Sequence, residues 1–181
     1  MKTLLTVLSL AMIGFTAMAI ETPDYKTLEQ DGKFEVREYP AMTVARTAMG
    51  DGDFMRLFRY ISGGNEAEQK IAMTAPVLVQ HKGEDRGMSF VVPREVAAKK
   101  VPAPKADDVA VDEMPAAKFA VFTYSGRRTD ANEAEALSKL RAWAEKKNLK
   151  TEGEPVFAYY DPPWTLPFMR RNEVMLRVAQ D

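Results

Sequence analysis

Two stretches of this sequence carry large apolar side chains where a surface segment is normally polar. The first, Tyr159-Tyr-Asp-Pro-Pro-Trp-Thr-Leu-Pro-Phe-Met169, holds four aromatic residues, one leucine, one methionine and three prolines. Proline restricts the backbone, so this loop can hold its aromatic side chains in place at low entropic cost. Two interpretations stay open. Composition favours a loop that completes the core, while aromatic and methionine side chains also suit one wall of a site for a flat apolar ligand.

The second stretch is a predicted short helix that poses the same question. Phe54, Leu57, Phe58 and Ile61 recur at positions i, i+3, i+4 and i+7, which predicts one apolar helix face packed on the core. Asp53 is the expected N-cap, because its carboxylate can accept hydrogen bonds from backbone N–H groups that lack a partner, and Gly63-Gly64-Asn65 ends the helix. Met55, Arg56 and Arg59 project elsewhere. Guanidinium groups pair with carboxylates, so an apolar ligand with carboxylate arms would suit this surface.

The sequence carries no familiar catalytic motif. It has no Gly-rich phosphate loop, no Gly-x-Ser-x-Gly, no His-Glu-x-x-His and no cysteine, which excludes disulfides, thiolate metal sites and cysteine nucleophiles. Its one histidine, His81, lies in a polar segment, 81–87, between the predicted strands 77–80 and 88–93. We expect this side chain to face solvent, with iron ligation as the minor alternative. The net charge of −1 offers no basic footprint for nucleic acid.

The N-terminal residues 1–19 resemble a cleavable export signal. Lys2 precedes an apolar run to Phe15, and Ala17-Met-Ala19 provides the small-x-small pattern that a signal peptidase accepts. The run is shorter than the roughly 20 apolar residues that a membrane-spanning helix needs. We therefore expect a mature chain of residues 20–181 that is exported, to the periplasm if the source is a Gram-negative bacterium, and that is not inserted in the membrane.

The mature chain shows one pattern twice. Phe34-Glu-Val-Arg-Glu-Tyr-Pro-Ala41 aligns with Val109-Ala-Val-Asp-Glu-Met-Pro-Ala116 at an offset of 75, and each copy precedes a helical segment and two further strands. This period is longer than that of solenoid repeats and indicates a duplicated β-β-α-β-β unit, with pseudo-repeats at about 25–95 and 106–178. The second helix is expected from Thr129-Asp130 to about Lys147. Residues 96–108, rich in Ala, Lys and Pro, predict a solvated connector.

These elements predict a single α+β domain. Short connections favour antiparallel neighbours, so about eight strands would form a distorted antiparallel β-barrel with two helices packed outside it. Closure of the barrel would also remove exposed strand edges.

Two blocks of the sequence carry a resemblance to a known family. Lys70-Ile-Ala-Met-Thr-Ala-Pro-Val77 and Pro162-Pro-Trp-Thr-Leu-Pro-Phe-Met-Arg-Arg-Asn-Glu-Val174 resemble the SOUL family of haem-binding proteins, over roughly Tyr25 to Val178. The resemblance implies a distorted barrel from a duplicated unit. It also implies that haem or another tetrapyrrole is held in an apolar cleft between the first helix and the loop before the last strand. The implied contacts are Phe54, Met55, Phe58, Arg59, Trp164, Leu166, Phe168 and Met169.

Some family members are proposed to ligate iron through a histidine near the first helix, and this sequence has none there. A tetrapyrrole held by apolar contact is therefore the expected mode. The expected function is an exported carrier, buffer or scavenger with a small-molecule ligand and no catalytic residues, and a monomer is expected. Two alternatives stay open: an enzyme that acts on the bound molecule, for example by removing metal from a tetrapyrrole, and a general binding module for small amphipathic ligands.

Overall fold

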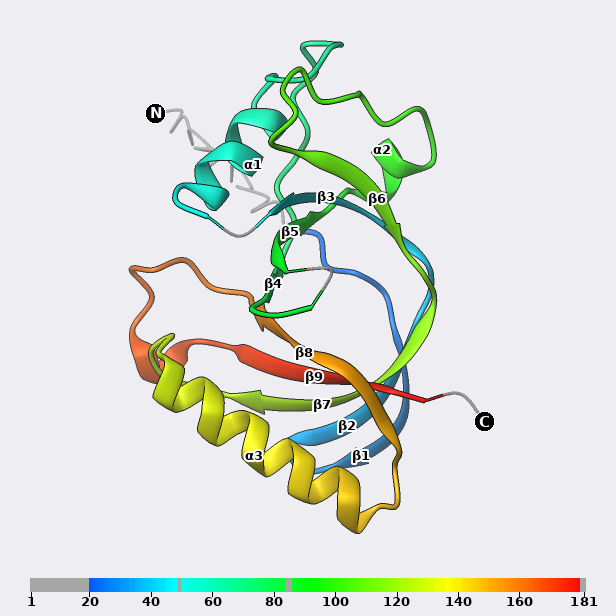
Figure 1. The fold of residues 1–181 in the computed structure, drawn as a ribbon, viewed down its shortest axis with the longest axis vertical. Helices are drawn as coiled ribbons and strands as arrows, with labels where there is room; N and C mark the ends of the chain where they lie inside the picture. Colours follow the sequence, from blue (N-terminus) through cyan, green and yellow to red (C-terminus); the bar gives the residue numbers. More distant parts are fainter. Residues whose placement is uncertain (1–19, 49, 84–85, 180–181) are drawn as a thin grey trace, which may run out of the picture.

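Nine antiparallel strands curl into one half-barrel sheet, and two longer helices pack against it (Figure 1). The computed structural model describes residues 20–48, 50–83 and 86–179, so the expected export signal lies outside the described residues. The strands are β1 (Lys26–Asp31), β2 (Phe34–Tyr39), β3 (Met42–Ala48), β4 (Val77–Gln80), β5 (Gly87–Val91), β6 (Ala110–Met114), β7 (Ala117–Tyr124), β8 (Thr151–Tyr159) and β9 (Asn172–Val178). The helices are α1 (Asp53–Ile61), α2 (Arg94–Ala97) and α3 (Asp130–Lys146), with a 3-10 turn, η1 (Pro167–Met169).

The strand order confirms the α+β barrel-like fold built from a repeated unit. Across the sheet the order is β1-β2-β7-β9-β8-β4-β5-β3-β6. Without β1, the remaining eight strands are symmetric. If β2 is exchanged with β6, β3 with β7, β4 with β8 and β5 with β9, the result is the same strand order read from the opposite edge of the sheet. Helices α1 and α3 occupy equivalent places, between β3 and β4 and between β7 and β8. The offset of 75 in the sequence therefore corresponds to a pseudo-twofold arrangement of two β-β-α-β-β units.

The sheet is open at both edges. Strand β1 precedes the first unit, has no counterpart in the second and pairs with β2. In the described residues, β6 pairs with β3 and not with β1, so the half-barrel is not closed by hydrogen bonds between its ends. The predicted complete closure is therefore not what the fold achieves, and the concave face stays accessible.

Alternation along each strand divides the core into an outer and an inner layer. Outward side chains of β2, β7, β8 and β9 pack against Leu140 and Trp143 of α3. Leu57 and Ile61 of α1 pack on Ala45 and Phe90 of the other half. Inward side chains fill the concave face with a third cluster: Tyr39, Val44, Leu78, Val91, Ala117, Phe119, Val121, Ala158 and Met175. Each helix thus covers one half of the sheet from outside.

The helix ends agree with the sequence at α3 and differ at α1. The N-cap of α3 is Thr129, whose hydroxyl accepts a hydrogen bond from Asn132 N at 3.3 Å. The N-cap of α1 is Gly52 and not Asp53. Gly52 has a φ of 79°, a left-handed conformation that glycine adopts without strain, and Asp53 follows as the first helical residue. The Asp53 carboxylate instead accepts the Gly50 N–H at 3.1 Å, which closes the turn before the helix.

The predicted connector, residues 96–108, is solvated along most of its length but is anchored to the first unit at Pro102. Pro102 is buried, and the Tyr60 hydroxyl donates to its carbonyl at 2.7 Å. Glu66 N donates to the Ala103 carbonyl at 2.9 Å. Few apolar side chains are needed for this packing, because the connector is held mainly through its backbone carbonyls, which composition does not reveal.

Candidate ligand-binding site

Helix α1 presents a pair of aromatic side chains at the edge of its buried stripe. Leu57, Tyr60 and Ile61 are buried, whereas Phe54 and Phe58 are 39% and 42% exposed. Their rings lie nearly parallel with centroids 6.1 Å apart, and Phe54 also meets the ring of Phe90 edge-on at 5.4 Å. The prediction that both phenylalanines pack inside the core is therefore wrong. Tyr60, which is bonded to the connector, lies within the buried stripe of the helix, and the two phenylalanines lie at the margin of that stripe.

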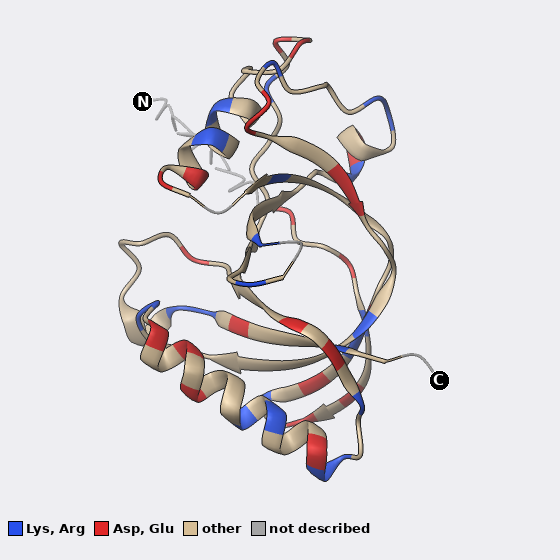
Figure 2. Ribbon diagram, in the orientation of Figure 1, with Lys and Arg blue, Asp and Glu red and all other residues tan. Residues whose placement is uncertain are grey.

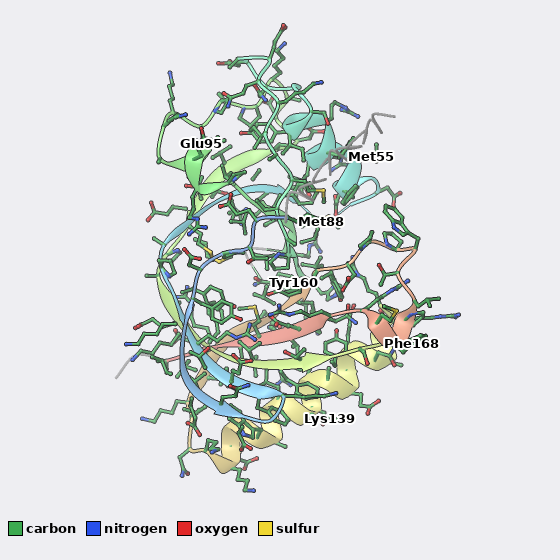
Figure 3. All side chains as sticks on the ribbon, turned by 180° about the vertical axis from the view of Figure 1, so that it is seen from behind. Met55, Met88, Glu95, Lys139, Tyr160 and Phe168 are labelled. Carbon is green, nitrogen blue, oxygen red and sulfur yellow. The ribbon has the colours of Figure 1, made fainter. Side chains whose placement is uncertain are left out.

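The remaining candidate residues of α1 are exposed. Met55 is 57% exposed, and Arg59 also lies on the solvent side of the helix. Figure 3 shows Met55 projecting from the outer side of α1. The predicted ligand contacts on this helix are thus all accessible, and they form a surface rather than the wall of a closed cavity.

The loop of residues 160–171 exposes its apolar side chains. Trp164 and Phe168 are 84% and 73% exposed, and Leu166 and Met169 are also mostly exposed. The interpretation that this loop completes the core is therefore wrong. In Figure 3, Phe168 lies on the same side of the molecule as Met55. The loop, like the helix, offers apolar surface that no described part of the chain covers.

Hydrogen bonds hold this loop in one shape. The Arg170 guanidinium donates to the carbonyls of Thr165, at 2.8 Å, and Pro163, so it clips the loop from within. Gly126 N, in the turn between β7 and α3, donates to the Pro167 carbonyl at 2.9 Å. Because these bonds satisfy the loop's carbonyls, the exposed aromatic side chains stand on a fixed backbone.

Adjacent strands connect the helix surface to the loop. Phe90 of β5 pairs with Val77 of β4, and Val77 pairs with Tyr159 at the end of β8, where the loop begins. Neighbouring strands lie about 4.8 Å apart, so the foot of the loop is roughly 10 Å from Phe90, the residue on which Phe54 packs. The register therefore brings the two predicted halves of the site to the same end of the sheet.

A buried polar network anchors the far end of the loop. The Arg37 guanidinium donates to both carboxylate oxygens of Glu173, at 2.9 and 3.1 Å, and to Glu35 at 2.9 Å. Arg171 donates to Glu173 at 2.7 Å, and the Tyr160 hydroxyl donates to it at 2.9 Å. Glu173 thus ties β2 to both ends of the loop. Sequence reasoning missed this network, and its only signal was charged residues two apart in strands that are otherwise apolar.

The network determines the ionisation of its members. Burial alone would raise the pKa of Glu173, but hydrogen bonds and the charges of Arg37 and Arg171 hold the pKa of this carboxyl below its ordinary value. Burial raises the pKa of Tyr39 to about 12, and burial together with the Glu173 charge raises the pKa of Tyr160. Glu173 is therefore ionised and both tyrosines are neutral at physiological pH.

His81 lies apart from the helix and loop residues and has a partner of its own. Its Nε2 lies 2.8 Å from Glu133 Oε2 on α3, and its ring centroid is 5.4 Å from that of Phe157. The Tyr159 hydroxyl donates to the other oxygen of Glu133. The side chain is partly exposed, as expected, but it joins the β4–β5 hairpin to α3. In the described residues no three Asp, Glu or His side chains are grouped to hold a metal ion.

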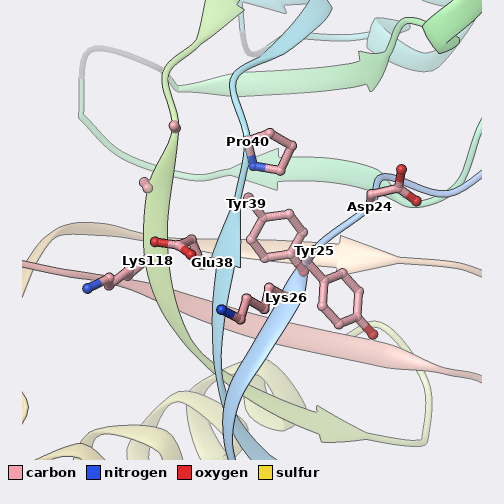
Figure 4. Close-up of a pocket in the computed structure, with 9 residues that line it drawn as sticks. Asp24, Tyr25, Lys26, Glu38, Tyr39, Pro40 and Lys118 are labelled. Atoms are coloured by element: carbon pink, nitrogen blue, oxygen red, sulfur yellow. The ribbon is translucent and has the colours of Figure 1, made fainter.

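Two hollows lie away from the predicted contacts. One, of about 390 Å³, lies at the start of β1, the end of β2 and the start of β7, and is lined by Tyr25, Tyr39, Pro40 and the charged residues shown in Figure 4. The other, of about 560 Å³, opens on the concave face, with Val44, Leu78 and Phe119 among the apolar residues that line it. Neither hollow is lined by any of the eight predicted contact residues.

Comparison with models of protein families shows to which family this chain belongs. The model of the SOUL haem-binding protein family matches residues 20–177. The chain belongs to the SOUL family. Among curated proteins, this SOUL protein is 32% identical to haem-binding protein 2 of Homo sapiens, with 88% of this chain and 87% of the relative covered. It is 25% identical to haem-binding protein 1 of Xenopus tropicalis, with 81% and 84% covered.

Solved structures resemble the SOUL protein in fold alone. The crystal structure of the EcmrR C-terminal domain has a TM-score of 0.57 at 14% identity, with 87% of this chain and 99% of that chain covered. A hydrolase from Listeria innocua has a TM-score of 0.52 at 14% identity, with 81% and 92% covered.

In the described part of the SOUL protein, no helix is long and apolar enough to cross a membrane.

The family motif that runs from the end of the loop into β9 coincides with the residues that hold the loop. Arg170 clips the loop to itself, Arg171 and Glu173 belong to the buried network, and Asn172 Nδ2 donates to the Gly126 carbonyl at 3.2 Å. Val174 is fully buried under α3. In this SOUL protein the motif therefore shapes the aromatic loop.

Proposed function

We propose that this protein binds haem or another tetrapyrrole against the exposed apolar surface of α1 and the loop of residues 160–171. Membership of the SOUL family and its haem-binding relatives support the class of ligand. The observation that carries the placement is the hydrogen-bonded loop that keeps Trp164 and Phe168 exposed at the same end of the sheet as Phe54 and Phe58.

The surface has the chemistry that a porphyrin requires. Its aromatic faces and the Met55 and Met169 thioethers give polarizable contacts to a flat macrocycle, and Arg59 provides a guanidinium for a propionate carboxylate. Covering such a surface releases water from apolar area, at about 25 cal/mol per Å². The protein would hold its ligand mainly by contact and so act as a carrier, buffer or scavenger, exported through residues 1–19 and monomeric.

Haem titration of the wild-type chain and the Trp164→Ala variant tests this placement. We expect saturable one-to-one binding by the wild type, with a Soret band and quenching of Trp164 fluorescence, and binding at least about fivefold weaker in the variant. Leu28→Ala is the control, because Leu28 is an exposed apolar side chain on β1 that belongs to neither α1 nor the loop. Equal haem affinity in all three proteins would contradict the proposed site.

A second candidate is supported by the hollow of about 560 Å³ on the concave face, whose size lies within the range of small-molecule sites. Apolar residues beside Arg46, Asp112 and Arg177 would suit a small amphipathic ligand. Met114→Trp would fill part of this hollow. If Met114→Trp lowers the haem affinity and Trp164→Ala does not, the haem site lies on the concave face and not at the loop.

A further inference from the structure

The hollow on the concave face has an apolar floor that the proposed tetrapyrrole surface does not use. Its volume is about 560 Å³, which is within the range of small-molecule sites. Val44 of β3, Leu78 of β4 and Phe119 of β7 line it, and all three belong to the inner apolar cluster. The curl of the sheet therefore builds a second apolar surface, separate from α1 and from the loop of residues 160–171.

A smaller hollow extends this floor. The two hollows share four lining residues: Leu78, Met114, Phe119 and Val156. Met42 and Met175 also line the smaller one. Methionine side chains are flexible and polarizable, so they adapt to ligands of different shape. The floor is therefore suited to a compact apolar body and does not require one particular outline.

Acidic side chains outnumber basic ones around the larger hollow. Its lining includes four acidic residues and two basic ones: Asp112, Glu113, Glu152, Glu154, Arg46 and Arg177. Figure 2 shows acidic positions on β6 and on β8. Segment 81–87, which joins β4 to β5 beside the hollow, contains two acidic and two basic residues and so adds no net charge. The lining as a whole is negative.

Most of the acidic residues have no ionic partner. Arg46 pairs with Asp112 at 2.8 Å. In the part of the chain that the structure describes, no ion pair involves Glu113, Glu152 or Glu154. Arg177 is directly opposite Glu152 in the register of β8 and β9. Even when this cross-strand neighbour is counted against Glu152, two carboxylates of the lining remain without a counter-charge.

An irregularity in β8 places one of these carboxylates at the mouth of the hollow. The register of β8 and β9 shifts between Glu152 and Val156, and Gly153 has a φ of 71°, which glycine adopts without strain. The Glu154 side chain passes so close to Gly83 that a Cβ at Gly83 would lie 3.3 Å from Glu154 Cγ. The turn of the β4–β5 hairpin therefore supports the stem of Glu154.

We infer that the concave hollow binds a small lipophilic cation. Its apolar body lies on Leu78, Phe119 and the methionines, and its positive charge lies near Glu152 and Glu154. A tetrapyrrole would bring its own carboxylates to this acidic rim, and a neutral molecule would gain only the contact with the floor. The inference therefore names a second class of ligand at a second site, and it does not depend on tetrapyrrole binding.

Fluorescence anisotropy with two dyes tests this inference. Rhodamine 6G is a cation and fluorescein is an anion at neutral pH, and both contain the same flat xanthene ring system. The two dyes therefore compare the effect of charge on similar apolar bodies. We expect saturable one-to-one binding of rhodamine 6G, with an affinity at least about tenfold higher than that of fluorescein. Added salt should weaken the binding of rhodamine 6G.

Two sets of variants separate the contribution of charge from that of the floor. Glu152→Gln combined with Glu154→Gln should lower the affinity for rhodamine 6G at least about fivefold and reduce its salt dependence. Glu145→Gln is the matched control, since it changes an exposed glutamate on α3 that does not line the hollow. Met114→Trp, which fills part of the hollow, should lower the affinity at least about tenfold. Circular dichroism checks that each variant is folded.

Absence of rhodamine 6G binding, or equal affinity for the two dyes, would overturn the inference. So would binding that is unchanged in the double glutamine variant. Trp164→Ala should leave the affinity for rhodamine 6G unchanged, and a loss there would place the dye on the loop and contradict the concave site.

Haem titration of the same proteins separates the two proposals. Met114→Trp should retain its haem affinity, whereas Trp164→Ala should lose it. Haem binding by a protein that does not bind rhodamine 6G would leave the proposed function intact and overturn the cation site. Rhodamine 6G binding without haem binding would support only the cation site.

Discussion

Arg37 and Glu173, 136 residues apart in the sequence, form a bidentate ion pair that is closed to solvent. Their side chains are 1% and 0% exposed, and the two N–O distances are 2.9 and 3.1 Å. The pair joins β2 to the strand that ends the aromatic loop, with Arg171 and Tyr160 bound to the same carboxylate. Removal of one partner would leave a buried charge, so the pair controls both the stability of the sheet and the seating of the loop.

Glu173→Gln should therefore destabilise the protein. The variant removes one of the two carboxylates that pair with the buried Arg37 and leaves Glu35 as the other, which should cost about 3 kcal/mol in the free energy of unfolding. Urea unfolding followed by circular dichroism measures this cost. Glu135→Gln, which removes an exposed pair with Lys139 on α3, is the control and should unfold like the wild type. Equal stability of Glu173→Gln and the control would contradict a role for the pair.

The same carboxylate predicts how stability depends on pH. Because the pKa of Glu173 in the folded state lies below its ordinary value of 4.5, its contribution is present above pH 4.5 and is lost as the pH falls below that value. Glu35 shifts in the same direction through its hydrogen bond to Arg37. Unfolding free energies between pH 3 and 7 should fall below about pH 4.5. A profile as steep in Glu173→Gln as in the wild type would show that other groups cause the loss.

Phe58→Asp should weaken porphyrin binding more than His81→Ala. The first change puts a charge into the exposed aromatic pair of α1, and we expect a loss of at least about tenfold, or 1.4 kcal/mol. His81 lies against Glu133 and not on the proposed surface, so its removal should have little effect. Since Phe58 is 42% exposed, the variant should fold, which circular dichroism checks. An equal or larger loss with His81→Ala would indicate iron ligation by that residue.

Metal-free protoporphyrin should bind nearly as well as haem. Contact energy from buried apolar area, about 25 cal/mol per Å², does not require iron. Quenching of Trp164 fluorescence provides both affinities under the same conditions, and we expect them to agree within about threefold. A preference for haem of more than about a hundredfold would mean that a protein side chain coordinates the iron.

Tyr60→Phe should loosen the connector between the two units. Tyr60 is buried, and its hydroxyl donates to the Pro102 carbonyl at 2.7 Å. Loss of this bond leaves a buried carbonyl without a partner, which costs about 1–2 kcal/mol of unfolding free energy. Hydrogen exchange should become faster in residues 98–108. Unchanged exchange in that segment would show that other contacts hold it.

Local patterns in the sequence were sufficient for the elements and their duplication. The offset of 75 between Val36 and Val111 predicted two equivalent units, and the sheet order confirms them. The start of α3 at Thr129-Asp130 and the hairpin around His81 lie where they were predicted. These features depend on residues within a few positions of one another, or on a repeated pattern, and both are visible in one dimension.

Only the tertiary structure decided which apolar residues are covered. Periodicity placed Phe54 and Phe58 on the same helix face as Leu57, but burial depends on where distant strands meet that face, and both rings lie at its margin. Composition could not show whether the Trp164 loop folds inward, since its orientation depends on the turn at Gly126 and on Arg170. The Arg37–Glu173 pair was hidden for the same reason: strands far apart in sequence bring its two charges together.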